Sequence, residues 1–233
     1  MSRLSNRAIE QHYFEQFRKH YSLPAGELEY SDKPDVIIRG TKTLGIEIAN
    51  LYVSSGDDPS SEQVQRPCRA RVLERAHALH LAAGGDSAEL SVDFDPKHPI
   101  HEIESTARQL AELAAKVSGL HGPVNPSLFA SIPQLRYVYR NSGEYPEARW
   151  HAVQSHRVPA LSVQRLRDVV SEKAAKAEHY LPCDTYWLLL VVDFIDRAQD
   201  QDIGWPQAER LGESPFERVL LYKPQFAQVV RVP

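Results

Sequence analysis

The 233-residue chain has only two cysteines, Cys68 and Cys183, and no apolar run long enough to span a bilayer. Because the cysteines form no CxxC pair, neither a disulfide framework nor a zinc knuckle is indicated. The longest clean apolar run, residues 187–192, is far shorter than the ~20 residues that a transmembrane helix needs. The N-terminus also lacks the apolar core and cleavage site of a signal peptide. We therefore expect a cytoplasmic, bacterial-type protein with no membrane association.

Positive charge is not in excess, since 27 Lys and Arg stand against 31 Asp and Glu for a net charge of −4. Attraction of the whole molecule to nucleic acid is therefore excluded. The charge is unevenly placed, because residues 134–181 are locally basic and residues 182–217 are strongly acidic. This pattern is typical of solvated faces, but it also permits a polyanion-binding surface beside an acidic segment that contacts another protein. Without GxGxxG, P-loop or GxSxG motifs, common nucleotide and α/β-hydrolase sites are not indicated.

Hydrophobic periodicity predicts a mixed α/β (α+β) fold. The expected helices are residues 6–21, 62–82, 100–120 and 162–180. The expected strands are residues 27–31, 35–39, 44–49, 88–95, 185–195, 218–222 and 228–232, with a further hairpin formed by 134–140 and 149–154. Because no linker is evident, we expect a single domain over residues 1–233.

The segment KPDVIIRGTKTLGIEIANLY, residues 33–52, places two carboxylates in runs that otherwise have the pattern of buried strands. If Arg39 pairs with Thr43 across the turn, then Asp35 lies opposite Glu47, with Cβ atoms roughly 5 Å apart. Two such charges repel each other and lose solvation, and a shared Mg²⁺ relieves both costs. A register slipped by one residue would instead send the two acids to opposite faces of the sheet.

A third acid lies on the first predicted helix. At about 100° per residue, Glu10 falls in the middle of the apolar face that Ile9, Tyr13 and Phe17 define, whereas Glu15 falls on the polar side. A glutamate that faces the core needs a partner. Glu10 is therefore either a member of the same metal site or one half of a salt bridge.

The order helix with Glu10, strand, strand with Pro34-Asp35, strand with Glu47, helix, strand resembles the PD-(D/E)XK nuclease superfamily, which has the restriction-endonuclease-like fold. Its α-β-β-β-α-β core would cover about residues 6–95, with residues 96–233 as a C-terminal extension. The resemblance implies a hydrolase that binds Mg²⁺ or Mn²⁺ through Asp35, Glu47 and Glu10 and cleaves phosphodiester bonds in nucleic acid, DNA being preferred to RNA.

One position departs from the family pattern, because the signature lysine two residues after the glutamate is Ala49 here. Of the lysines elsewhere, Lys173 is the preferred replacement. For the substrate phosphates we expect four binding residues: Arg69, Arg71, Lys176 and Tyr180. Solvent-facing lysines on an amphipathic helix are the alternative interpretation of Lys173 and Lys176. The corresponding alternative function is a catalytically disarmed module that binds nucleic acid or protein, with a homodimer also left open.

Overall fold

The computed structural model describes residues 3–143, 147–153, 158–206 and 208–233. The sequence predicts one domain, but the chain divides into two compact units. The first unit is discontinuous and comprises Met1–Ser54 and Val158–Pro233, whereas the second is Ser55–Arg157. The second unit is therefore inserted between two segments that fold together, and the expected core at about 6–95 contains residues from both units.

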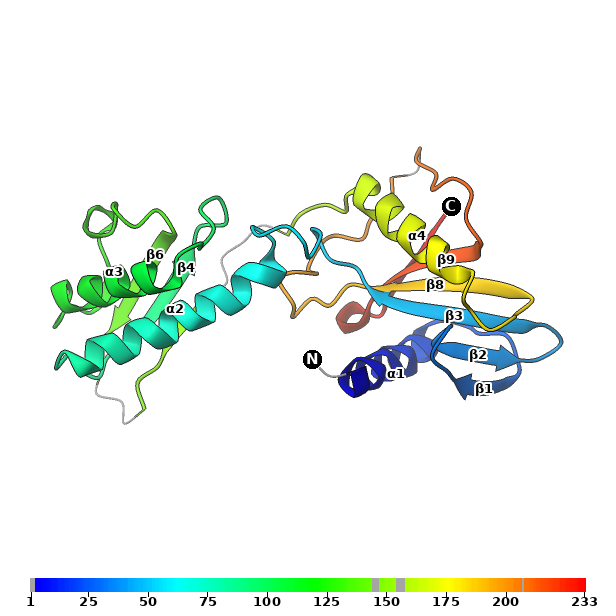
Figure 1. The fold of residues 1–233 in the computed structure, drawn as a ribbon, viewed down its shortest axis with the longest axis horizontal. Coiled ribbons are helices and arrows are strands. Elements are labelled where there is room, and N and C mark those ends of the chain that lie inside the picture. The colour runs from blue at the N-terminus through cyan, green and yellow to red at the C-terminus, as the bar shows by residue number, and fades with distance from the viewer. Residues whose placement is uncertain (1–2, 144–146, 154–157, 207) are drawn as a thin grey trace. The chain divides into compact units, whose positions relative to one another are not determined.

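The first unit is built on a six-stranded sheet with the order β1-β2-β3-β8-β9-β10 (Figure 1). Strands β1, β2 and β3 form an antiparallel meander, β3, β8 and β9 are parallel, and β10 returns antiparallel to β9. The elements are α1 (Arg3–His20), β1 (Glu27–Tyr30), β2 (Val36–Arg39), β3 (Thr43–Asn50), α4 (Val163–Ala177), β8 (Thr185–Val191), β9 (Phe216–Lys223), a 3₁₀ turn η2 (Pro224–Phe226) and β10 (Gln228–Val232).

Helices α1 and α4 pack against opposite faces of this sheet. Phe14 and Phe17 of α1 are fully buried against a cluster that includes Ile46 and Ile48 of β3. Leu166, Val169 and Val170 of α4 pack on the other face, in a cluster that includes Leu188 and Leu190 of β8, with Ala49 of β3 packed against it. Because side chains alternate along a strand, Glu47 lies on the face of β3 that α4 covers.

The predicted register of the first hairpin is confirmed. Arg39 lies opposite Thr43, and Ile37 lies opposite Gly45. Strand β2 begins at Val36, so Asp35 immediately precedes it and, in the same register, stands across from Glu47. The expected helix at the N-terminus is also confirmed as α1.

An α-β-β-β-α-β order occurs in the first unit, but the sequence assigns its last two elements wrongly. The helix and strand that complete it are α4 and β8, which pairs in parallel with β3. The predicted elements at 62–82 and 88–95 do form, as α2 (Glu62–Ala82) and β4 (Glu89–Phe94), but they belong to the second unit. Both candidate pairs have suitable patterns, and the pattern of a strand does not specify its partner.

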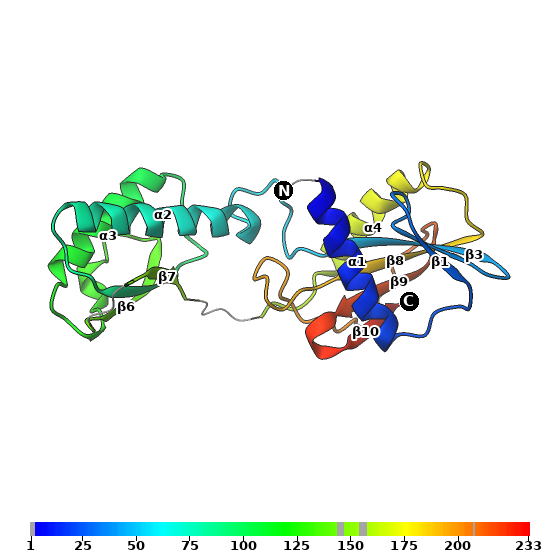
Figure 2. The ribbon, with the colours of Figure 1, turned by 90° about the horizontal axis from the view of Figure 1, so that it is seen from below.

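The second unit has a four-stranded sheet with the order β5-β6-β4-β7, and its helices α2 and α3 cover one face of that sheet (Figure 2). The predicted hairpin of 134–140 and 149–154 is wrong, because both strands pair with β4, which lies between them. The remaining elements of the second unit are α3 (Ile103–Lys116), β5 (Gly122–Pro123), a 3₁₀ turn η1 (Pro126–Leu128), β6 (Leu135–Asn141) and β7 (Trp150–Ala152).

The expectation of a mixed α/β architecture is confirmed by these two mixed sheets and their helices. Across the described ranges, none of the helices combines the length and the apolar character that crossing a bilayer requires.

Candidate functional site

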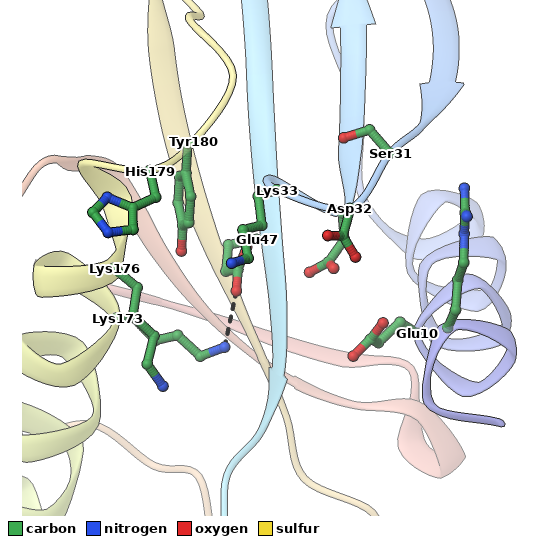
Figure 3. A pocket seen from close by; sticks show the side chains of 11 residues that line it. Glu10, Ser31, Asp32, Lys33, Glu47, Lys173, Lys176, His179 and Tyr180 are labelled. Atoms are coloured by element: carbon green, nitrogen blue, oxygen red, sulfur yellow. Dashed lines mark hydrogen bonds and ion pairs between the residues drawn. The ribbon is translucent and has the colours of Figure 1, made fainter. Parts of the chain in front are cut away.

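A cavity of about 720 Å³ opens in the first unit beside strand β3 (Figure 3). Its walls come from α1, from the loop between β1 and β2, from β3, and from the C-terminal half of α4 with the residues that follow. Every side chain that lines it is charged or polar. The lining comprises four carboxylates, four Lys or Arg residues, and three further polar side chains: Glu10, Asp32, Asp35, Glu47; Arg7, Lys33, Lys173, Lys176; and Ser31, His179, Tyr180.

The two acids of the first hairpin do meet in this cavity. Glu47 is 8% exposed in the middle of β3, and Asp35 lies at the start of β2. The amide of Ile48 donates a hydrogen bond of 2.6 Å to Asp35 Oδ2, which holds this carboxylate against β3. The spacing of the acids in the sequence and the hairpin register therefore bring both carboxylates to one site, as predicted.

Lys173 completes this arrangement from α4. Its ammonium Nζ lies 2.9 Å from Glu47 Oε1, and the side chains of the two residues are 19% and 10% exposed. The helix that carries it starts at the N-cap Ser162, whose side chain accepts a hydrogen bond from the amide of Arg165. Ala49, where the family pattern has its lysine, packs instead against the apolar cluster beneath α4. The cationic group thus reaches Glu47 from the helix rather than from the strand.

Burial and neighbouring charges change the acidity of two of these carboxylates. Burial is the largest cause that raises the pKa of Asp35, and Glu47 and Glu10 add to it; with the opposing effects of the Ile48 amide and Lys173, the pKa is raised to about 8. The pKa of Glu10 is also raised, mainly by burial and to a smaller extent by Glu47 and Asp32. Figure 3 shows Glu10 on α1, on the other side of Glu47 from Lys173. The raised pKa values of Asp35 and Glu10 therefore reflect burial first and the neighbouring carboxylates second.

Two buried polar atoms of the cavity lack a hydrogen-bond partner in the part of the chain that the structure describes. They are Glu47 Oε2 and the hydroxyl of Tyr180. The pKa of Tyr180 is raised by burial, by the charge of the Glu47 carboxylate, and by a contact between its hydroxyl and that carboxylate which is too long or bent to count as a full hydrogen bond. A buried polar atom without a hydrogen-bond partner lowers the stability of the fold. A ligand in this cavity could therefore gain affinity by binding Glu47 Oε2 and the Tyr180 hydroxyl.

The loop that carries Asp35 is fixed by close packing around Gly45. A Cβ atom on Gly45 would lie 2.7 Å from Pro34 Cγ and 2.8 Å from Tyr186 Cδ1, so a larger residue would displace both. The amide of Leu181 also donates a 2.8 Å hydrogen bond to the carbonyl of Lys33. This bond ties the residues after α4 to the loop before β2.

The remaining predicted residues separate into two groups. Lys176 lines the cavity and pairs with Glu172 one turn earlier on the exposed surface of α4. Arg69 and Arg71 belong to α2 in the second unit and are not among the residues that line this cavity. Arg69 is instead buried and pairs with Glu62 at 2.6 Å. The sequence predicts that α2 faces the site because it is the helix that follows β3. Because α2 belongs to a unit inserted after β3, this position in the sequence no longer supports that prediction.

Sequence reasoning missed five residues of the lining: Arg7, Ser31, Asp32, Lys33 and His179. Three of them directly precede Pro34-Asp35, and Arg7 lies one turn before Glu10 on α1. Their positions next to residues already selected were the available signal, because neighbours in a loop or one turn away on a helix share the same surroundings.

The carboxylates fit one divalent cation better than a full protein cage. Over the described ranges, no group of three or more His, Cys, Asp or Glu side chains is arranged to hold a metal ion. Mg²⁺ commonly binds through one or two carboxylates and fills its other positions with water and phosphate oxygens. The unpartnered Glu47 Oε2 beside Asp35 is consistent with that binding mode.

Comparisons of this chain with protein-family models, with curated proteins and with solved structures find no match. What the site does must therefore be inferred from its geometry.

Proposed function

We propose that the protein is a Mg²⁺- or Mn²⁺-dependent nuclease that hydrolyses phosphodiester bonds, with its site at Glu47, Asp35 and Lys173. The observation that carries this proposal is the 2.9 Å contact between Lys173 Nζ and Glu47 Oε1 in the cavity that also contains Asp35. Two adjacent carboxylates and a lysine are the groups needed to bind a metal ion and to offset the charge of a phosphate undergoing attack.

The topology of the first unit supports a PD-(D/E)XK-like assignment. Its elements α1, β1, β2, β3, α4 and β8 follow the α-β-β-β-α-β order of that superfamily, with the acids on β3 and at the start of β2. The alanine at position 49 argues for a disarmed site only if nothing replaces the lysine. Lys173 supplies an ammonium group to the same glutamate, which favours the enzyme over the disarmed binding module.

Each residue has a distinct role in this proposal. Asp35 and Glu47 would hold the cation, and Glu10 adds negative charge from α1. When bound, the metal ion lowers the pKa of a coordinated water and stabilises charge on the phosphate. Lys173 donates a hydrogen bond to Glu47 and is positioned to donate others to the attacking water or to a phosphate oxygen.

The rim of the cavity supplies the groups that would hold a polynucleotide backbone. Arg7 and Lys33 line the cavity from α1 and the loop before β2, whereas Lys176 and His179 line it from α4 and the residues after it. Cations on two sides of the carboxylates fit a chain of phosphates that passes over them. Contacts of this kind position a backbone without reading its sequence. DNA is the first substrate to test, followed by RNA.

A cleavage assay tests the proposal. Purified protein is incubated with supercoiled plasmid, single-stranded DNA or RNA, each with Mn²⁺, Mg²⁺ or a chelator, and Glu47→Ala is run in parallel. We expect metal-dependent cleavage that the substitution abolishes. Failure to cleave any substrate by a folded protein would contradict the enzyme, and nucleic-acid affinity unchanged by Glu47→Ala would then favour the binding module.

A further inference from the structure

The residues after α4 place a second unsatisfied group in the cavity. Tyr180 is 8% exposed, and its ring packs against the ring of Tyr186 with 5.7 Å between centroids. Its hydroxyl has no hydrogen-bond partner in the part of the chain that the structure describes. In Figure 3 the ring stands on the same side of Glu47 as Lys173, with its oxygen directed into the cavity.

The neighbouring tyrosine shows what a structural hydroxyl looks like at this place in the fold. Tyr186 donates a 2.8 Å hydrogen bond to the carbonyl of Leu181 and accepts one of 3.0 Å from the amide of Cys183. Both bonds hold the turn between α4 and β8. Tyr180, on that same turn, bonds neither of these backbone groups, and its hydroxyl has only the loose contact with the Glu47 carboxylate.

The two unpartnered atoms differ in what they need. Glu47 Oε2 is a carboxylate oxygen and requires a cation or a donor, whereas a tyrosine hydroxyl directed at carboxylates is best satisfied by donating to an oxygen. A divalent cation together with a phosphate oxygen satisfies both. A cation that binds the Glu47 carboxylate would compete for it with the Tyr180 hydroxyl, which would then need another oxygen as acceptor.

We propose that Tyr180 is a further catalytic residue, which donates a hydrogen bond from its hydroxyl to a non-bridging phosphoryl oxygen of the bound substrate. This inference rests on the proposed nuclease function and specifies a donor for it. No bond to Tyr180 forms or breaks, and the phenol keeps its proton throughout. Its hydrogen bond would strengthen as negative charge grows on the phosphoryl oxygens.

Two matched variants separate a catalytic hydroxyl from a structural one. Tyr180→Phe removes the unpaired hydroxyl and keeps the ring, and Tyr186→Phe removes a hydroxyl that makes two hydrogen bonds. Without metal, we expect Tyr180→Phe to unfold at the same temperature as the parent protein or higher, and Tyr186→Phe to unfold lower. In metal-dependent cleavage, we expect kcat to fall about 100-fold in Tyr180→Phe with KM nearly unchanged.

Thermal shift with Mg²⁺ and thymidine 5′-phosphate adds a readout that does not depend on turnover. The rise in melting temperature caused by the phosphate should be smaller in Tyr180→Phe than in the parent, whereas the rise with Mg²⁺ alone should be equal. A lower melting temperature of metal-free Tyr180→Phe, or an undiminished kcat, would overturn the role of Tyr180 and leave the nuclease intact. If the parent neither binds metal nor cleaves, the proposed function fails first, and the role of Tyr180 fails with it.

Discussion

Lys173 Nζ and Glu47 Oε1 lie 2.9 Å apart although their residues are 126 positions apart in the sequence. The whole second unit is inserted between them, after β3 and before α4. The pairing of β8 with β3 and the packing of α4 over that sheet bring the lysine back to the glutamate. A family pattern that expects both residues on one strand would therefore find only the glutamate.

The first expectation concerns this ion pair. Lys173→Met leaves the largely buried Glu47 carboxylate without its cation, and we expect metal-free unfolding to become easier by about 2–4 kcal/mol. The double variant Glu47→Gln with Lys173→Met removes both charges and should recover most of that loss. Urea unfolding of the parent, both single variants and the double variant measures the coupling. Purely additive effects would show that the two groups do not interact in solution.

The second expectation concerns pH. Because the pKa of Asp35 is raised to about 8 in the folded protein, folded Asp35 keeps a proton between pH 4 and 8 that the unfolded chain has released. The stability of the metal-free protein should therefore fall as pH rises through that window. Mn²⁺ competes with the same proton, so its affinity should rise toward pH 8.

Asp35→Asn provides the control for that pH dependence. The amide keeps an oxygen that can accept the hydrogen bond from Ile48 but has no charge to titrate. Melting temperatures from pH 5 to 8 should be flatter in the variant, and stabilisation by Mn²⁺ should largely disappear. An unchanged pH slope would mean that Asp35 is not the group responsible.

The third expectation concerns the packing that holds the loop before β2. Gly45→Ala places a methyl group within 3 Å of both Pro34 and Tyr186, and we expect a cost of about 1–3 kcal/mol. Because that packing positions Asp35, Mn²⁺ affinity should fall as well. Gly204→Ala, where the nearest atom to an added Cβ is 3.5 Å away, should change neither quantity. Titration calorimetry with Mn²⁺ beside thermal melting distinguishes the two variants, and equal behaviour would contradict the account.

The fourth expectation concerns an arginine that the sequence wrongly places at the site. Arg69 is buried in the second unit, pairs with Glu62, and has its guanidinium 5.9 Å from the centre of the Phe94 ring. Arg69→Ala should speed hydrogen exchange in α2 and β4 while leaving KM for cleavage unchanged. The exposed Arg71→Ala should change neither the exchange rates nor KM. A raised KM in Arg69→Ala with normal exchange would restore its role as a phosphate ligand.

Local patterns were sufficient to predict the parts of the site that depend on short-range structure. The hairpin register follows from a turn flanked by two apolar runs, and it places Asp35 across from Glu47. The apolar stripe of α1 correctly selects Glu10 as the acid that faces the site, since Glu10 lines the cavity. Lys173 was selected because the segment SEKAAKAEHY resembles helices of nuclease-like proteins that face the site, and both Lys173 and Tyr180 line the cavity.

What the sequence could not specify was which segments pair over long distances. Strand β8 has the continuous apolar run of a central strand and β4 has an alternating pattern, but neither pattern specifies β8 as the neighbour of β3. The junction at Ser55 falls in the polar segment SSGDDPSS, residues 54–61, whose composition equally fits a surface loop within one domain. The expectation of a single domain, and the assignment of Arg69 and Arg71 to the site, both followed from that missing information.

The most direct test compares two lysines that lie three residues apart on α4. Lys173 contacts Glu47, whereas Lys176 pairs with Glu172 at the exposed rim. With Mn²⁺ and the substrate that the parent cleaves best, we expect Lys173→Met to lose about 100-fold or more in kcat, a loss typical of removing one group that stabilises the transition state. Lys176→Met should change mainly KM, by a few-fold. Equal kcat for Lys173→Met and the parent would contradict the claim that Lys173 serves as the lysine of a nuclease site.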